Sequence, residues 1–194
     1  MENFNVQRFV EKMAGLAKSP SDVIRTAIDE KDYINAAASV VCGNIIILLI
    51  ALSRIFFGVM PSPVEMVKGL IMVDIFFAVG AWCYFIGGRL MGGTGSIEDV
   101  AIACAMVCAP IMAINGVLPT LTVIALKSGG GIAATLIPVW KWVARVLPAL
   151  INFFALKESH GFDTSGKAFV ALIVSEIIIM IAMIPLVAVL GKIL

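Results

Sequence analysis

The chain has 194 residues, of which 61% are hydrophobic and 14% charged, and its formal net charge is +1 at pH 7. A soluble globular domain is about half apolar and about a quarter charged, so this composition excludes an ordinary soluble domain. The apolar residues gather in runs of about 20, the length that crosses a hydrocarbon layer about 30 Å thick. No basic cluster interleaved with aromatic residues indicates a nucleic-acid partner. The sequence therefore predicts an all-α, multi-pass integral membrane protein.

Residues 1–33 are predicted to be a cytosolic amphipathic helical segment that precedes a membrane domain over 34–194. Within 4–17, one helical stripe opposite the charged residues carries Phe9, Val10, Met13 and Leu16. This helix is too short and too charged to span a membrane, so we expect it to lie at the membrane interface or to bind a partner helix. Pro20 suits the first turn of a second short helix, over about 20–30, with Ser19 and Asp22 in capping-box spacing.

A bundle of five transmembrane helices is predicted to follow, over about 34–57, 66–90, 96–126, 132–156 and 168–193. The third is expected to begin at a Ser96–Asp99 capping box and to bend at Pro110 or Pro119. With the N-terminus inside, eight lysines and arginines lie on the inner side and three, Lys68, Lys127 and Lys192, on the outer side. This asymmetry predicts a cytoplasmic N-terminus and a C-terminus on the opposite side.

Four ionisable residues are expected at membrane depth: Asp74, Lys141, Arg145 and Glu176. Lys141 and Arg145, four residues apart, share one helix face. With a rise of 1.5 Å per residue, Asp74 falls level with Lys141 and Glu176 level with Arg145. Two interpretations stay open. The four residues form ion pairs that fix the register of the helices, or they form a polar site that conducts ions or binds a lipid headgroup or another anion.

Small residues recur every four positions along the third predicted span, at Ala101, Ala105, Ala109 and Ala113. Such a ridge lets helix backbones approach closely in lipid. We expect this helix to be central in the bundle or to be a seam with a second copy or another membrane protein. The four cysteines, Cys42, Cys83, Cys104 and Cys108, all lie in apolar segments and are interpreted as small buried residues. No metal or cofactor is expected.

The predicted inner loop after the fourth span carries Glu158, His160 and Gly161. Residues 161–168 come close to a phosphate-binding loop, but Ala168 stands where that loop needs a hydroxyl and a membrane helix precedes it. His160 is the only histidine, and no nucleophile or second acid is arranged with it by the sequence. We expect no enzymatic activity.

Three stretches together resemble the Yip domain family, membrane proteins named for interacting with Ypt/Rab GTPases. They are "SPSDVIRTAIDEKDYINAA", "GGTGSIEDVAIACAMVCAPIM" and "ALKESHGFDTSGKAF". The resemblance implies five spans, a cytosolic N-terminus and a C-terminus on the other side. Eukaryotic members act in vesicle traffic, bind small GTPases and one another, and have a long cytosolic N-terminal region. Only about 33 residues precede the first predicted span here, which argues against GTPase binding and favours a prokaryotic member.

The leading functional hypothesis is therefore a non-enzymatic membrane protein that organises membranes or binds partners, with the lipid bilayer as its first partner. The alternative is a small transporter or channel whose path is lined by the four intramembrane charged residues. A third hypothesis is a chaperone or subunit for another membrane protein.

Overall fold

The structure is a computed structural model that describes residues 4–53, 55, 62–127 and 131–193, without the side chains of 117–119, 121–127, 131–137, 140 and 189–193. Over these residues the chain forms α-helices and no strand, as predicted. The helices are α1 (Val6–Lys18), α2 (Pro20–Asp29), α3 (Tyr33–Ser53), α4 (Pro63–Leu90), α5 (Ile97–Lys127), α6 (Gly131–His160) and α7 (Ser165–Ile193).

Four helices are long and apolar enough to cross a membrane within the described residues. They cover Tyr33–Ser53, Pro63–Leu90, Ile97–Gly116 and Ser165–Ala188. The chain is accordingly an integral, multi-pass membrane protein. The remaining predicted span lies in α6, which has 30 residues but is not among these four; Lys141 and Arg145 interrupt its apolar sequence.

Helix starts follow local capping chemistry. The Ser96–Asp99 capping box is confirmed: Asp99 N donates to Ser96 Oγ at 3.1 Å, and Ser96 N donates to Asp99 Oδ2 at 3.0 Å. Pro20 occupies the first turn of α2, but the Ser19 side chain makes no capping hydrogen bond, so that part of the prediction was wrong. The capping box thus places the N-terminal end of α5, and Pro20 marks that of α2.

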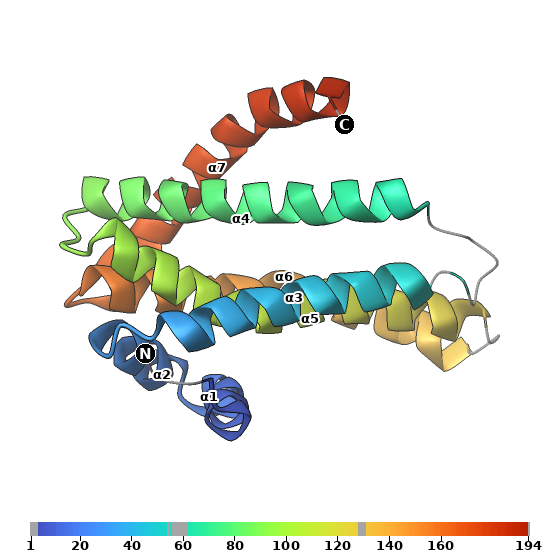
Figure 1. Cartoon of the computed structure of the whole chain (residues 1–194), viewed down its shortest axis with the longest axis horizontal. Helices are drawn as coiled ribbons and strands as arrows, with labels where there is room; N and C mark the ends of the chain where they lie inside the picture. Colours follow the sequence, from blue (N-terminus) through green and yellow to red (C-terminus); the bar gives the residue numbers. More distant parts are fainter. Residues whose placement is uncertain (1–3, 54, 56–61, 128–130, 194) are drawn as a thin grey trace.

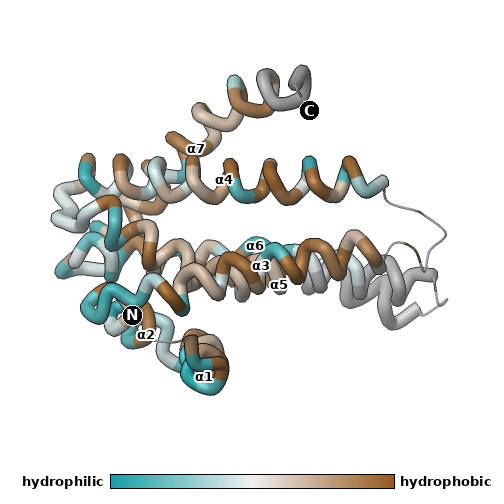
Figure 2. Tube along the Cα trace, in the orientation of Figure 1, coloured by the Kyte–Doolittle hydropathy of each residue, from teal (hydrophilic) through white to brown (hydrophobic). Residues whose placement is uncertain are grey.

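Figure 1 shows α3, α4, α5 and α6 running lengthwise, with α7 leaning away. The contacts pair α3 with α5, α5 with α6, and α4 with α7. Helix α1 is seen end-on in the same view, so it runs across the direction of the long helices. Figure 2 shows hydrophilic residues gathered over α1, α2 and the nearby end of the bundle.

The most buried side chains lie at that same end. One core cluster joins α4, α5, α6 and α7 around Tyr84, Val100 and Leu156. A second cluster joins Leu16 of α1 and Ile24 of α2 to α5 and α6. The two N-terminal helices are therefore docked on the bundle.

A hydrogen bond from α3 supports the packing of α5 where Pro110 interrupts its backbone hydrogen bonding. Pro110 has no N–H, so the carbonyl of Met106 loses its helical partner. Ser39, fully buried on α3, donates from Oγ to that carbonyl at 3.0 Å and accepts from Ala109 N at 3.1 Å. Helix α5 thus continues through Pro110 to Lys127. The side chain of Pro119, the other predicted bend, lies outside the described residues.

Candidate functional site

Three segments far apart in the sequence meet at one end of the bundle. They are α2 with the turn into α3, the 91–96 connection between α4 and α5, and the end of α6 with the 161–164 connection that follows it. We call this meeting point the loop-end junction. Charged and polar side chains link the three segments pairwise.

Glu158 links α6 to α2. Its Oε2 accepts hydrogen bonds from Arg25 Nε at 2.9 Å and Arg25 Nη2 at 2.7 Å, and its Oε1 accepts one from Ser21 Oγ at 2.9 Å. The Glu158 side chain is only 4% exposed, so these partners offset the cost of removing its charge from water. The hydrogen bond with Glu158 raises the pKa of Arg25, and the negative charge of Glu158 raises it further. The link holds α2 against the end of α6.

The turn after α2 is linked to the start of α5. Lys31, whose φ is 52°, extends its Nζ to Asp99 Oδ1 at 2.7 Å and to Glu98 Oε2 at 3.4 Å. The Tyr33 hydroxyl also donates to Glu98. The hydrogen bond with Asp99 raises the pKa of Lys31. Asp99 therefore caps α5 and anchors the turn at the same time.

Helix α1 joins this network through its basic face. Arg8 Nη2 and Lys12 Nζ contact Glu30 Oε2 at 2.9 and 3.0 Å, and Lys12 Nζ contacts Asp32 Oδ2 at 2.5 Å. Burial acts to raise the pKa of Asp32, but hydrogen bonds from Lys12 and Asn35 outweigh it and lower the pKa. The orientation of α1 is thus fixed by charge pairs as well as by packing.

His160 lies at the centre of the loop-end junction and is only 1% exposed. Its ring stacks on Phe85 with centroids 6.4 Å apart and lies 5.7 Å from the Phe162 ring. Within the described residues, neither ring nitrogen has a hydrogen-bond partner that meets normal geometry. Burial lowers the pKa of His160 and outweighs the opposing effect of the Tyr84 backbone, and the nearby Arg89 charge adds to the lowering. The neutral imidazole therefore serves here as a packed ring.

Glycines of the "GGRLMGGTG" stretch make room for this ring. A Cβ atom added at Gly88 would overlap the imidazole, and one at Gly93 would lie 2.7 Å from its Nδ1 and Cβ. A Cβ at Gly95 would overlap the carbonyl of Ser159. Thr94 N donates to the carbonyl of His160 at 3.1 Å, which closes the contact. The glycine-rich segment is thus explained by close packing on the end of α6.

The three stretches singled out in the sequence are the same three segments that form this junction. A family model described as the Yip1 domain matches residues 14–187, which include all three. The chain belongs to the Yip1 domain family. No curated protein and no solved structure gave a significant match to the chain.

Of the two interpretations of the charged residues at membrane depth, the ion pairs of Asp74 with Lys141 and of Glu176 with Arg145 are not formed within the described residues of the Yip1 domain. Asp74 Oδ1 accepts from Asn44 Nδ2 at 3.0 Å, and Glu176 Oε1 accepts from the Tyr84 hydroxyl at 2.8 Å. Within the described part of the chain, Lys141 and Arg145 form no ion pair, and both side chains are exposed. Depth along a helix does not fix the direction in which a side chain points, so level residues need not meet.

The predicted stripe on α1 divides between two environments. Phe9 and Leu16 are buried, and Met13 packs on the core clusters. Val10 is exposed. The sequence showed that the helix is amphipathic, but not that one side of its apolar stripe packs on the protein itself.

The small-residue ridge of the Yip1 domain lies partly against α3. Ala105 and Ala109 are buried, Ala113 is half-buried and Ala101 is exposed. Gly43 of α3 allows a close approach here, because an added Cβ would lie 3.1 Å from Cys108 Sγ. Sequence reasoning missed Ser39, although the missing N–H of Pro110 signals that another hydrogen-bond donor must reach the carbonyl of Met106. Among the described residues, no group of three or more His, Cys, Asp or Glu side chains could hold a metal ion.

Proposed function

We propose that this Yip1 family protein is a non-enzymatic scaffold that organises the membrane on its cytoplasmic side. In this proposal α6 crosses the membrane as the fourth of five spans, over about 132–156, the N-terminus is cytoplasmic and the C-terminus lies on the opposite side. The lysine and arginine asymmetry supports that orientation. The loop-end junction then lies at the cytoplasmic surface and holds α1 beside the inner leaflet.

The observation that carries the proposal is the exposed apolar strip on α1. Val6 and Val10 are 64% and 57% exposed, and Ala14 and Ala17 are exposed on the same face, at spacings of four, four and three residues. This exposed strip lies next to the side of α1 that carries the buried Phe9 and Leu16. Helix α1 therefore has a protein-facing side, an exposed apolar side and a polar side. An interfacial helix needs such an apolar side to insert between lipid headgroups.

The surroundings of α1 support the same role. An apolar groove of about 360 Å³ runs from Leu16 and Ala17 of α1 to Leu147 and Leu150 of α6. The exposed strip meets this groove at Ala17. Since α1 also runs across the long helices (Figure 1), it has the direction of a helix lying in the membrane plane.

Vesicle remodelling tests the proposal. The full chain reconstituted into large vesicles should convert them to smaller or tubular forms, and Val6→Ser with Val10→Ser should abolish this. The matched control is Gln7→Ser with Glu11→Ser, which alters the polar side of α1 and should leave remodelling intact. Unchanged vesicles with the wild-type chain would contradict the proposal, as would equal activity of the Val6 and Val10 variant.

A transporter is the second candidate because Asp74, Lys141, Arg145 and Glu176 are all exposed, and none of them forms an ion pair within the described residues. It predicts a flux in proteoliposomes that Glu176→Gln abolishes. The scaffold is favoured because Asp74 and Glu176 are each hydrogen-bonded by a neutral side chain, and because the cavity between α4 and its neighbours has mostly apolar walls.

A further inference from the structure

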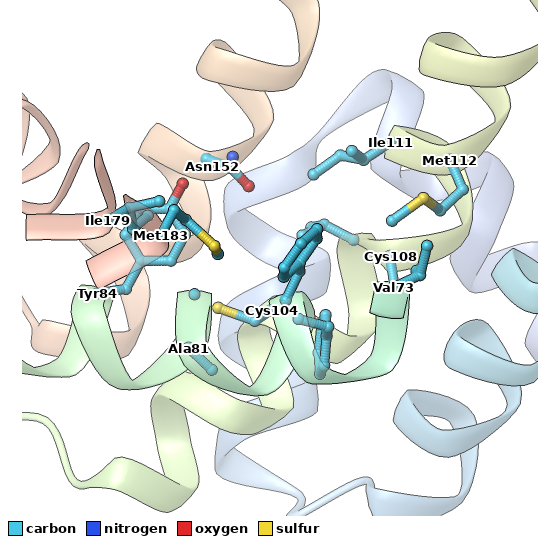
Figure 3. A pocket seen from close by; sticks show the side chains of 14 residues that line it. Val73, Ala81, Tyr84, Cys104, Cys108, Ile111, Met112, Asn152, Ile179 and Met183 are labelled. Atoms are coloured by element: carbon cyan, nitrogen blue, oxygen red, sulfur yellow. The ribbon is translucent and has the colours of Figure 1, made fainter. Parts of the chain in front are cut away.

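A cavity of about 250 Å³ lies between α4, α5, α6 and α7. Its walls are mainly apolar, with Phe77 and Gly80 on α4, Ile111 on α5, and Ile179 and Met183 on α7. Figure 3 shows the labelled side chains converging on this space from the four helices.

The position of the cavity decides which solvent it meets. Three of its four walls are helices that are long and apolar enough to cross the membrane. Figure 1 shows α7 leaning away from the other long helices, and the cavity lies where α7 and α4 face α5 and α6. Because its walls are mainly apolar and belong mostly to membrane spans, lipid chains are the abundant apolar species that can fill it.

The length of the cavity matches one leaflet. Its lining residues on α4 run from Val73 to Tyr84, which are 11 residues apart. At 1.5 Å of rise per residue this is about 16 Å along the helix. Half of a hydrocarbon layer about 30 Å thick is about 15 Å. The cavity therefore has the length of one acyl chain in one leaflet.

One polar group in the wall has no partner in the described part of the chain. Asn152 of α6 lines the cavity, and Figure 3 shows its side chain on the side across from α4. It lies eight residues before His160, about 12 Å along α6 from the loop-end junction. An unpaired amide in apolar surroundings is unfavourable, so an oxygen acceptor on the occupant would be stabilised here.

We infer that this cavity binds one chain of a glycerophospholipid from the leaflet on the side of the loop-end junction, with the oxygen that joins chain to glycerol accepting a hydrogen bond from Asn152 Nδ2. The site is independent of the role of α1. Its specificity is for the polar linkage near Asn152, because the rest of the wall offers mainly apolar contact.

The chain offers a matched pair of variants on one helix. A Cβ added at Gly80 or at Gly69 meets no atom within 4 Å, but only Gly80 lines the cavity. Gly80→Leu therefore fills the cavity from its wall, whereas Gly69→Leu adds the same side chain to α4 elsewhere. Thermal midpoints of both variants, measured in the same detergent, show that both are folded.

The experiment uses the full chain in vesicles containing a phospholipid with a photoreactive diazirine at mid-chain. Wild type and Gly69→Leu should cross-link at peptides of α4 and α7 and keep one lipid through purification, as seen by native mass spectrometry. Gly80→Leu should lower the cross-linking at least tenfold. Equal cross-linking in Gly80→Leu and wild type would overturn the inference. It would also be overturned if native mass spectrometry found no bound lipid on the wild type, or if another protein occupied the cavity.

Asn152→Leu supplies a second test that does not depend on Gly80→Leu. With wild type, unlabelled phospholipid should compete for the site better than a plain alkane of the same chain length. With Asn152→Leu this advantage should disappear while cross-linking by the chain persists. An unchanged preference for phospholipid in Asn152→Leu would overturn the assignment of Asn152.

Discussion

Ser39 Oγ on α3 donates a hydrogen bond of 3.0 Å to the carbonyl of Met106 on α5, the group that Pro110 leaves without its helical partner. This bond crosses the contact between α3 and α5 in the membrane domain. It explains how α5 continues as a helix through a proline while packing closely on a neighbour.

Ser39→Ala should lower the free energy of unfolding by about 1–3 kcal/mol, because it leaves a buried carbonyl unpaired. Unfolding in mixed detergent micelles, followed by circular dichroism, measures this change. Pro110→Ala restores an N–H to α5, so in that background Ser39→Ala should cost clearly less. An equal cost in both backgrounds would show that Ser39 acts through packing or through the hydrogen bond it accepts from Ala109 N, and not through the carbonyl of Met106.

A second prediction concerns the glycines around His160. Gly88→Ala should destabilise the chain by about 1–3 kcal/mol, because its Cβ would overlap an enclosed imidazole ring. Gly69→Ala, in the same helix, meets no neighbouring atom and should be neutral or stabilising by about 0.5–1 kcal/mol. Thermal midpoints of the two variants in one detergent test this difference. Equal midpoints would mean that the ring moves aside freely.

Much of the helical order could be predicted from the sequence, because apolar runs, prolines and caps act locally. The Ser96–Asp99 capping box and the start of α2 at Pro20 are examples. The hydrogen-bond partners of Asp74 and Glu176 could not be predicted, because they depend on the rotation of each helix about its own axis. Tyr84 reaches Glu176, which is 92 residues further along the chain, because α4 and α7 pack together.

The candidate site was predictable only in part for a related reason. The sequence drew attention to Glu158, His160 and the glycine-rich segment as separate features. Their meeting depends on the close approach that Gly88 and Gly93 permit, which no local pattern reports. Likewise, the periodicity of α1 fixes which residues share a face. Which side of that face packs on the bundle depends on long-range contacts, among them the apolar cluster around Leu16 and the ion pairs of Lys12 with Glu30 and Asp32.

A third prediction follows from the buried, neutral state of His160. Its pKa is lowered from the ordinary value of 6.5 when the protein folds, so the unfolded chain takes up a proton at higher pH than the folded chain does. Stability should therefore be constant with respect to this group above about pH 6.5 and should fall as pH drops from there towards the folded pKa. Because His160 is the only histidine, no other imidazole contributes.

Unfolding measured at several pH values between about 5.5 and 7.5 checks this dependence. His160→Asn and His160→Phe both remove the titrating group, and both should flatten the profile whatever their effect on absolute stability. A slope that persists in both variants would assign it to other groups.

The link between Arg25 and Glu158 leads to the last prediction. Arg25→Ala removes both guanidinium hydrogen bonds and leaves the Glu158 carboxylate, 4% exposed, with Ser21 as its remaining donor. Helix α2 should then detach more often from the end of α6, and its backbone amides should exchange with solvent several-fold faster, as measured by hydrogen exchange and mass spectrometry in detergent.

Glu158→Gln should have a smaller effect than Glu158→Ala because its amide oxygen can still accept from Ser21. Thr26→Ala, an exposed change in the same helix, should leave the exchange of α2 unchanged. If Arg25→Ala and Thr26→Ala exchange at the same rate, the docking of α2 depends on Ile24 and its apolar neighbours, and the charge pair adds nothing to it.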